Sequence, residues 1–257
     1  MIKLSKRLQT IASMVTEGNR LADVGTDHGF LPLYLLEQGK IPFALAMDVN
    51  QGPLERAKEH IETSPCKPYI QTRLSDGLSE LMPNEVDTIV IAGMGGGLMV
   101  RILTKELCKL EGVRELILQP QSEQWEVRKC LEELGFVIVD EDMLEEDGKY
   151  YVVMRALPQQ LAREATGVGE DFESLISTCQ EIDLSLLASI RYAYGPVLLK
   201  KHHPVLREWL EREVRISQEI IQRLSLPDVG EKARARRDEV IQKMQLQKTA
   251  LKILATM

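Results

Sequence analysis

The chain has 257 residues, of which 44% are hydrophobic, so it is long enough to bury one large core or two smaller ones. No apolar run is long enough to span a membrane, and no N-terminal segment has the pattern of a signal peptide, so we expect a cytoplasmic protein. The four cysteines form no C-x-x-C pair, which argues against a zinc site or a disulfide framework, and we expect no metal.

The formal net charge of −7 hides an asymmetry along the chain. Residues 185–257 contain 14 Lys and Arg against 8 Asp and Glu, which leaves 18 against 31 for the other 184 residues. A basic end on an acidic body suggests that this end meets a polyanion. A charged helical surface that happens to be positive is the alternative.

The first 160 residues predict an α/β fold. Leu4, Leu8, Ile11 and Val15 have helical spacing, which predicts an amphipathic helix over residues 3–17. Short apolar runs then predict strands at 20–25, 43–49, 69–74, 87–93 and 115–121, with helices between them at 30–39, 52–62, 98–110 and 123–135. Two further strands, at 136–144 and 149–157, follow each other directly and predict a terminal hairpin. This order predicts a mostly parallel, Rossmann-like sheet covered on both faces.

After Pro158 the pattern contains no convincing strand. Apolar residues at helical spacing predict a helix over 207–224 and another towards the C-terminus, joined by a turn at 225–230. We therefore predict two domains, residues 1–160 and residues 161–257, the second built around an antiparallel helical hairpin.

The segment "LADVGTDHGFLP", residues 21–32, contains the best candidate for a ligand-binding loop. Gly25 and Gly29 allow a tight turn between strand and helix. Asp48, 25 positions after Asp23, ends the next strand, where a carboxylate accepts hydrogen bonds from ribose hydroxyls. The motif therefore predicts a ligand that contains adenosine.

The charges of the loop favour one adenosine ligand over others. NAD and FAD carry a pyrophosphate, which carboxylates repel, whereas S-adenosyl-L-methionine carries a sulfonium cation, which Asp23 and Asp27 attract. Asp76 follows the third strand, where it either contacts the adenine ring or caps a helix. The predicted cofactor-binding residues are Asp23, Gly25, Thr26, His28, Gly29, Asp48, Val49, Asp76, Gly77, Gly93, Met94 and Gly95.

Taken in order, "LSKRLQTIASMV", "DVGTDHGFLP", "SDGL", "IVIAGMGG", "LILQP" and "EEDGKYYVV" resemble the TrmK family of bacterial tRNA (adenine-N1)-methyltransferases. The resemblance covers essentially the whole chain. It implies a class I methyltransferase domain, a coiled-coil-like helical tail that grips tRNA, and methylation of N1 of adenine 22. The chain departs from the family at Phe30, where members often have Tyr, and at Gln121, where they often have Asn.

The residues are consistent with this chemistry. Adenine N1 already has an in-plane lone pair, so the enzyme needs to orient the base rather than remove a proton. Gly93, Gly95 and Gly96 leave room for a base, with Met94 against its face, or they simply form a turn. Asp27 is the candidate to stabilise the cationic product, and Gln119 and Gln121 either read the adenine edge or close their loop. His28, predicted above to bind the cofactor, is equally well explained as a structural residue that makes a hydrogen bond.

Adenine N1 lies on the Watson–Crick edge, so the base must be exposed or flipped out before it is methylated. This requires contacts between the protein and the surrounding tRNA backbone. The candidates for phosphate contact are Lys200, Lys201, Arg207, Lys232, Arg234, Arg236 and Arg237, each of which could instead belong to a solvated helix face. We expect a monomer that binds tRNA. The alternatives are a small-molecule methyltransferase, a nicotinamide-dependent oxidoreductase and a non-catalytic RNA-binding protein.

Overall fold

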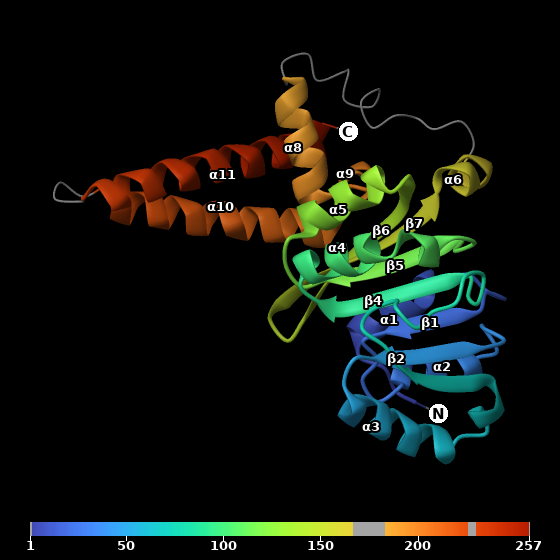
Figure 1. The fold of residues 1–257 in the computed structure, drawn as a ribbon. Helices are drawn as coiled ribbons and strands as arrows, with labels where there is room; N and C mark the ends of the chain where they lie inside the picture. Colours follow the sequence, from blue (N-terminus) through green and yellow to red (C-terminus); the bar gives the residue numbers. More distant parts are fainter. Residues whose placement is uncertain (1, 167–182, 226–229, 257) are drawn as a thin grey trace. The chain divides into compact units, whose positions relative to one another are not determined.

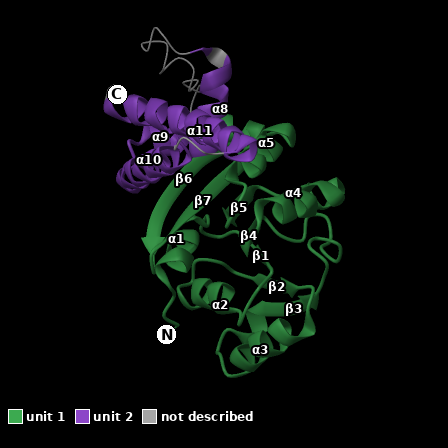
Figure 2. Ribbon diagram, turned by 90° about the vertical axis from the view of Figure 1, so that its left-hand side faces the viewer, with its two compact units in different colours: residues 1–168 green, residues 169–257 purple. Residues whose placement is uncertain are grey.

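The computed structural model describes residues 2–166, 183–225 and 230–256. The chain divides into two compact units, residues 1–168 (unit 1) and 169–257 (unit 2), coloured separately in Figure 2. The division lies beyond the boundary predicted near residue 160. The reason is helix α6 (Gln159–Thr166), which packs against the last two strands of unit 1.

The described part of unit 1 contains a seven-stranded sheet in the order β3-β2-β1-β4-β5-β7-β6 (Figure 1). The first five strands pair in parallel, β7 runs antiparallel to β5, and β6 and β7 form the predicted terminal hairpin. The strands are β1 (Leu21–Val24), β2 (Ala44–Asp48), β3 (Ile70–Leu74), β4 (Thr88–Met94), β5 (Glu115–Pro120), β6 (Phe136–Glu146) and β7 (Lys149–Pro158). The predicted Rossmann-like fold is therefore confirmed.

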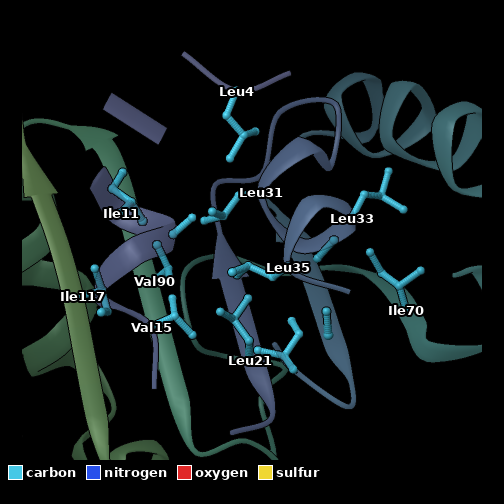
Figure 3. Close-up of a cluster of buried hydrophobic side chains, with 14 of the residues drawn as sticks. Leu4, Ile11, Val15, Leu21, Leu31, Leu33, Leu35, Ile70, Val90 and Ile117 are labelled. Carbon is cyan, nitrogen blue, oxygen red and sulfur yellow. The ribbon is translucent and has the colours of Figure 1, made fainter. Parts of the chain in front are cut away.

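Helices cover both faces of this sheet. One face carries α1 (Lys6–Met14), α2 (Phe30–Glu37) and α3 (Gln51–Glu62). Figure 3 shows part of the core on this side, where Ile11, Leu31 and Leu35 gather near Leu21, Val90 and Ile117. On the other side of the sheet, α4 (Gly96–Lys105) and α5 (Gln124–Glu133) pack together (Figure 2). The short 3-10 helices η1 (Lys67–Tyr69) and η2 (Leu107–Leu110) lie in connections.

Two helices differ most from their predicted bounds. The first, predicted over 3–17, is shorter, because the Ser5 side chain accepts a hydrogen bond from Leu8 N and caps the helix start, and Val15 is extended. The helix predicted over 98–110 begins earlier, at Gly96, where a Cβ would lie 2.5 Å from the carbonyl oxygen of Ser122. It ends at Lys105 because Glu106 leaves the helical conformation.

All regular elements among the described residues of unit 2 are helices. It contains α8 (Leu184–Tyr194), α9 (Pro196–Lys200), α10 (Pro204–Leu224) and α11 (Glu231–Thr256). The last two lie side by side (Figure 1), with Leu210, Val240 and Ile253 buried, and they form the predicted hairpin. Residues 226–229 of its predicted turn lie outside the described residues. None of the helices in the described ranges is long and apolar enough to cross a membrane.

Candidate active site

The loops that follow the five parallel strands meet at one edge of the sheet, where open α/β sheets bind their ligands. Backbone hydrogen bonds connect these loops. Gly25 N and Thr26 N donate to Met47 O at 2.8 and 2.9 Å, Ser75 N donates to Asp48 O at 2.8 Å, and Gln121 N donates to Met94 O at 2.8 Å. The predicted residues from β1 to β5 are thus brought to one site, although the segments lie up to about a hundred positions apart.

The glycine turn after β1 is covered by the methionine that ends β4. Gly25 has φ +79°, and the methyl group of Met94 occupies the place that a Cβ on Gly25 would take. Any other residue here would meet both backbone strain and Met94. Gly29, with φ +67°, precedes α2 and approaches Ala57 on α3, since its Cβ would lie 3.4 Å from that of Ala57. Both glycines are therefore needed by local geometry.

Asp23 is a buried carboxylate at the end of β1, with 7% of its surface exposed. Burial raises the pKa of Asp23 from 3.8 to about 6, the Thr26 hydroxyl and the charge of Arg7 lower it, and the charge of Asp48 raises it. The Thr26 hydroxyl is buried but makes no hydrogen bond of ordinary geometry within the described part of the chain. A buried carboxylate whose ionisation is costly is a feature of a ligand site rather than of a core.

The next two strands end in the residues predicted to hold the nucleoside. Asp48 accepts a hydrogen bond from Asn50 N at 2.7 Å, and Val49 beside it exposes 57% of its surface.

Asp76 follows β3 and pairs with Lys105 of α4 at 2.8 Å, which lowers the pKa of Asp76. The alternative role of Asp76 as a helix N-cap is wrong, because Gly77 to Glu80 form a turn. Gly77 has φ +63° and faces Ile102.

Asp27 has a partner that the sequence did not suggest. Its carboxylate accepts hydrogen bonds from Arg56 of α3, at 2.9 and 3.3 Å, and lies 3.6 Å from His28 Nε2. The His28 ring stacks on Phe30, with centroids 5.1 Å apart, and Phe30 stacks on His60 at 4.9 Å. In these contacts Asp27 and His28 hold the loop to α3, and the catalytic role of Asp27 stays a prediction.

A second polar group lies at the ends of β4 and β5. Gln119 is fully buried, and its Oε1 accepts a hydrogen bond from Arg7 Nη1 of α1 at 2.8 Å. The Arg7 guanidinium lies over the Tyr151 ring, 5.7 Å from its centroid. Gly93 has φ +77°, and its Cβ would lie 3.6 Å from Arg7 Nη1 and 3.8 Å from Gln121 Nε2. Gln121 therefore lies beside Gly93 of "IAGMGG", and Gln119 pairs in the sheet with the neighbouring Ala92.

The following glycines serve the start of α4. Gly95 precedes the helix, and its Cβ would lie 3.3 Å from Ser122 Oγ. The Glu123 carboxylate accepts a hydrogen bond from Ser122 Oγ at 2.7 Å and one from Gly97 N at 3.3 Å, and these contacts lower its pKa. A carboxylate at a helix N-terminus is favourable. The contacts of Gly95 and Gly96 therefore fit the second alternative, in which these glycines form a turn before a helix.

The predicted phosphate contacts all lie in unit 2. Lys200 ends α9, Lys201 follows it, and both are exposed. Arg207 instead donates a hydrogen bond to Leu254 O at 2.6 Å, which satisfies a carbonyl near the end of α11. The segment "KARARR" occupies the first two turns of α11 and contains Lys232, Arg234, Arg236 and Arg237. Arg236 pairs with Glu239 at 2.8 Å and Arg237 with Asp238 at 3.3 Å.

Sequence reasoning missed Arg7, Tyr151 and Arg56 as members of the site. Arg7 lies within the family-like element "LSKRLQTIASMV", which was the only sequence signal for it, and its partner is 112 positions away. Among the described residues, no group of three or more His, Cys, Asp or Glu side chains is arranged to hold a metal ion.

Fold and site together define a class I S-adenosyl-L-methionine-dependent methyltransferase. Residues 4–154 match the family model described as a methyltransferase domain. The chain is 35% identical to the tRNA (adenine(22)-N(1))-methyltransferase of Bacillus subtilis (strain 168), over 97% of this chain and 98% of that protein. It belongs to this family, the TrmK family of tRNA methyltransferases.

Solved structures agree with this assignment. The crystal structure of the B. subtilis m1A22 tRNA methyltransferase TrmK has a TM-score of 0.79 and 33% identity, covering 98% of this chain and 100% of that one. A Streptococcus pneumoniae protein in complex with S-adenosyl-L-methionine has a TM-score of 0.77 and 33% identity, covering 97% and 100%. The likeness thus includes unit 2 as well as the methyltransferase domain.

Proposed function

We propose that this chain transfers a methyl group from S-adenosyl-L-methionine to N1 of adenine 22 in tRNA. The observation that carries the proposal is the carboxyl edge of the sheet, which combines two carboxylates suited to the cofactor, Asp23 and Asp48, with Gly93 and two glutamine side chains at the ends of β4 and β5. The full-length match to a tRNA (adenine(22)-N(1))-methyltransferase supports the target position.

The residues of unit 1 fit the cofactor. Asp48 is available to ribose hydroxyls, and the exposed Val49 next to it offers an apolar surface to the adenine ring. Asp23 supplies negative charge from a buried position, and the buried Thr26 hydroxyl lies beside it. When bound, S-adenosyl-L-methionine supplies an electrophilic methyl group on a sulfonium cation.

The acceptor side has to orient a base rather than deprotonate it. Adenine N1 carries its lone pair in the ring plane, so attack on the methyl group forms the N1–C bond without a general base. Gln119 lies near the end of β5 and Gln121 directly follows that strand, and Gly93 on β4, beside Gln121, has no side chain. We propose that these amides hold the adenine edge while N1 faces the cofactor.

Unit 2 is proposed to bind the tRNA backbone. Lys232 and Arg234 lie in the first turn of α11, where cations oppose the helix dipole, so helix stability does not explain their presence. Exposed Lys and Arg side chains on a long helix suit phosphate oxygens, which carry no sequence information. We propose Lys200, Lys201, Lys232, Arg234, Arg236 and Arg237 as contacts, and a structural role for Arg207.

The test uses the purified protein, labelled S-adenosyl-L-methionine and two unmodified transcripts that differ only in adenine or guanine at position 22. We expect label on the first transcript alone, as 1-methyladenosine in the nucleoside digest. Equal labelling of both would contradict the target position. Cofactor binding without transfer to either would favour a small-molecule acceptor or a non-catalytic RNA-binding protein.

We also propose that the chain acts in the cytoplasm as a monomer, since one chain contains both the methyltransferase unit and the basic helices. Light scattering of the free protein and of its complex with one tRNA tests the oligomeric state. A mass of one chain per complex is expected, and a dimer would contradict it.

A further inference from the structure

We propose that Arg7 is a positioning residue for the acceptor base, which acts by holding the carboxamide of Gln119 in one orientation at the carboxyl edge of the sheet. This inference rests on the proposed function, because it assigns Arg7 to the base-binding half of the same site. It adds a residue from α1 to a site otherwise built from the loops that follow the β-strands.

The contact between the two side chains determines how the amide can face. A guanidinium has only hydrogen-bond donors, so it can donate to the carbonyl oxygen of Gln119 but cannot pair with the amide nitrogen, which is also a donor. Arg7 Nη1 lies 2.8 Å from Gln119 Oε1, and Gln119 Nε2 donates to Pro120 O at 3.2 Å. The amide orientation is therefore fixed by chemistry at both ends.

The location of this pair is the acceptor side of the site. Arg7 Nη1 and Gln121 Nε2 both approach Gly93, whose positive φ and missing side chain leave space between them. The charge of Arg7 also acts on Asp23, whose pKa it lowers. A glutamine amide recognises adenine through N6 and N7, which leaves N1 unobstructed for methylation.

Arg7 is itself held by a second layer of contacts. The Glu146 carboxylate, at the end of β6, accepts hydrogen bonds from the backbone nitrogens of Lys6 at 2.6 Å and Arg7 at 3.4 Å. The Tyr151 ring on β7 faces the guanidinium, an arrangement that favours a cation. The first turn of α1 is thus anchored to the β6–β7 hairpin, and a residue supported in this way keeps the geometry that positioning requires.

The test is a double-mutant cycle with Arg7→Met, Gln119→Leu and the double variant, which keep side-chain volume. Initial rates are measured at saturating S-adenosyl-L-methionine with the adenine-22 transcript, so that changes in cofactor affinity do not enter kcat. Lys6→Ala is the matched control, since it removes the neighbouring α1 cation, whose side chain is exposed. Thermal unfolding of every variant identifies losses due to misfolding.

We expect each single variant to lower kcat roughly 10- to 100-fold, as for a misplaced base. The kcat of the double variant should be no lower than that of the less active single variant. Arg7→Lys, which retains one donor for Gln119 Oε1, should recover part of the loss, and Lys6→Ala should keep the wild-type kcat. Full activity of Arg7→Met, or losses that multiply in the double variant, would overturn the inference alone. A wild-type protein inactive on this transcript would overturn the proposed function, and the inference with it.

Discussion

Unit 1 and unit 2 hold their polar side chains in different ways. In unit 1, Arg7 and Gln119 are joined over 112 positions and Asp23 is buried, so each group has one location set by distant parts of the chain. In unit 2, Arg236 and Arg237 pair with acidic residues three and one positions away on the same helix. Methyl transfer depends on fixed geometry, whereas phosphate contact depends on charge and reach. The difference predicts which measured quantity each unit controls.

The largest effect is expected at Asp48. Its replacement by Ala removes the carboxylate proposed to accept hydrogen bonds from the ribose, which is worth roughly 1.5–3 kcal/mol for a charged acceptor. We expect the Kd for S-adenosyl-L-methionine, measured by calorimetry, to rise about 10- to 100-fold, with tRNA binding unchanged. An equal loss of tRNA binding would remove the distinction between the units.

Asp23→Asn tests whether the buried carboxylate is kept for the cofactor at a cost in stability. The pKa of Asp23 in the folded protein, about 6, lies above its ordinary value of 3.8. The folded state therefore holds this proton more tightly than the unfolded state, and stability is lost as the pH rises from about 4 to about 6. The ionised Asp23 carboxylate therefore lowers the free energy of unfolding by roughly 3 kcal/mol above about pH 6.

We therefore expect Asp23→Asn to raise the unfolding temperature at about pH 7.5 and to leave it nearly unchanged below about pH 4. The same variant should bind S-adenosyl-L-methionine more weakly, and wild-type affinity should fall as the pH drops through about 6. Differential scanning calorimetry and titration calorimetry measure the two effects. A destabilised variant at neutral pH would show that the carboxylate supports the fold instead.

The fold was more predictable than these electrostatic details, for a physical reason. Short apolar runs mark buried parallel strands wherever they lie, so strand positions and the C-terminal hairpin followed from local sequence. The early start of α4 did not, because it depends on Gly96 meeting the Ser122 carbonyl. Likewise, Arg207 carries the same charge as its neighbours in the sequence but binds Leu254 O, a contact that only the packing of α10 on α11 creates.

The residues of the site also fall into two groups, those that local sequence predicts and those that depend on tertiary packing. Asp23, Gly25 and Asp48 were predictable because strand ends and glycine turns fix their place. Arg7 was not, since nothing in the local sequence of α1 indicates that a guanidinium reaches the end of β5. Asp27 was correctly placed in the loop, but its pairing with Arg56 depends on how α3 packs beside that loop.

A smaller effect is expected from unit 2. Replacing Lys232 and Arg234 by Ala removes two cations from α11, which should lower the slope of log affinity for tRNA against log salt by about two. KM for tRNA should rise, while kcat and the Kd for S-adenosyl-L-methionine stay at wild-type values. Lys58→Ala with Lys129→Ala, on α3 and α5 of unit 1, is the control of equal charge. An equal change in the control would show that the effect is one of net charge.

The smallest effect is expected for Asp27→Asn. The carboxylate is exposed and paired with Arg56, an arrangement usually worth about 0–1 kcal/mol. We expect kcat to change less than about fivefold, measured at saturating cofactor and tRNA. A loss of about a hundredfold or more would instead support the predicted role of Asp27 in stabilising the product cation.

The central claim is that N1 of adenine 22 is the atom that becomes methylated. The most direct test is a tRNA assembled with 1-deazaadenosine at position 22, in which a C–H group replaces N1 and the exocyclic amine remains. We predict that this tRNA binds and competes with the natural transcript but receives no label at position 22. Methyl transfer to the modified residue at a rate near that of adenosine would mean that another atom is the nucleophile and would contradict the account.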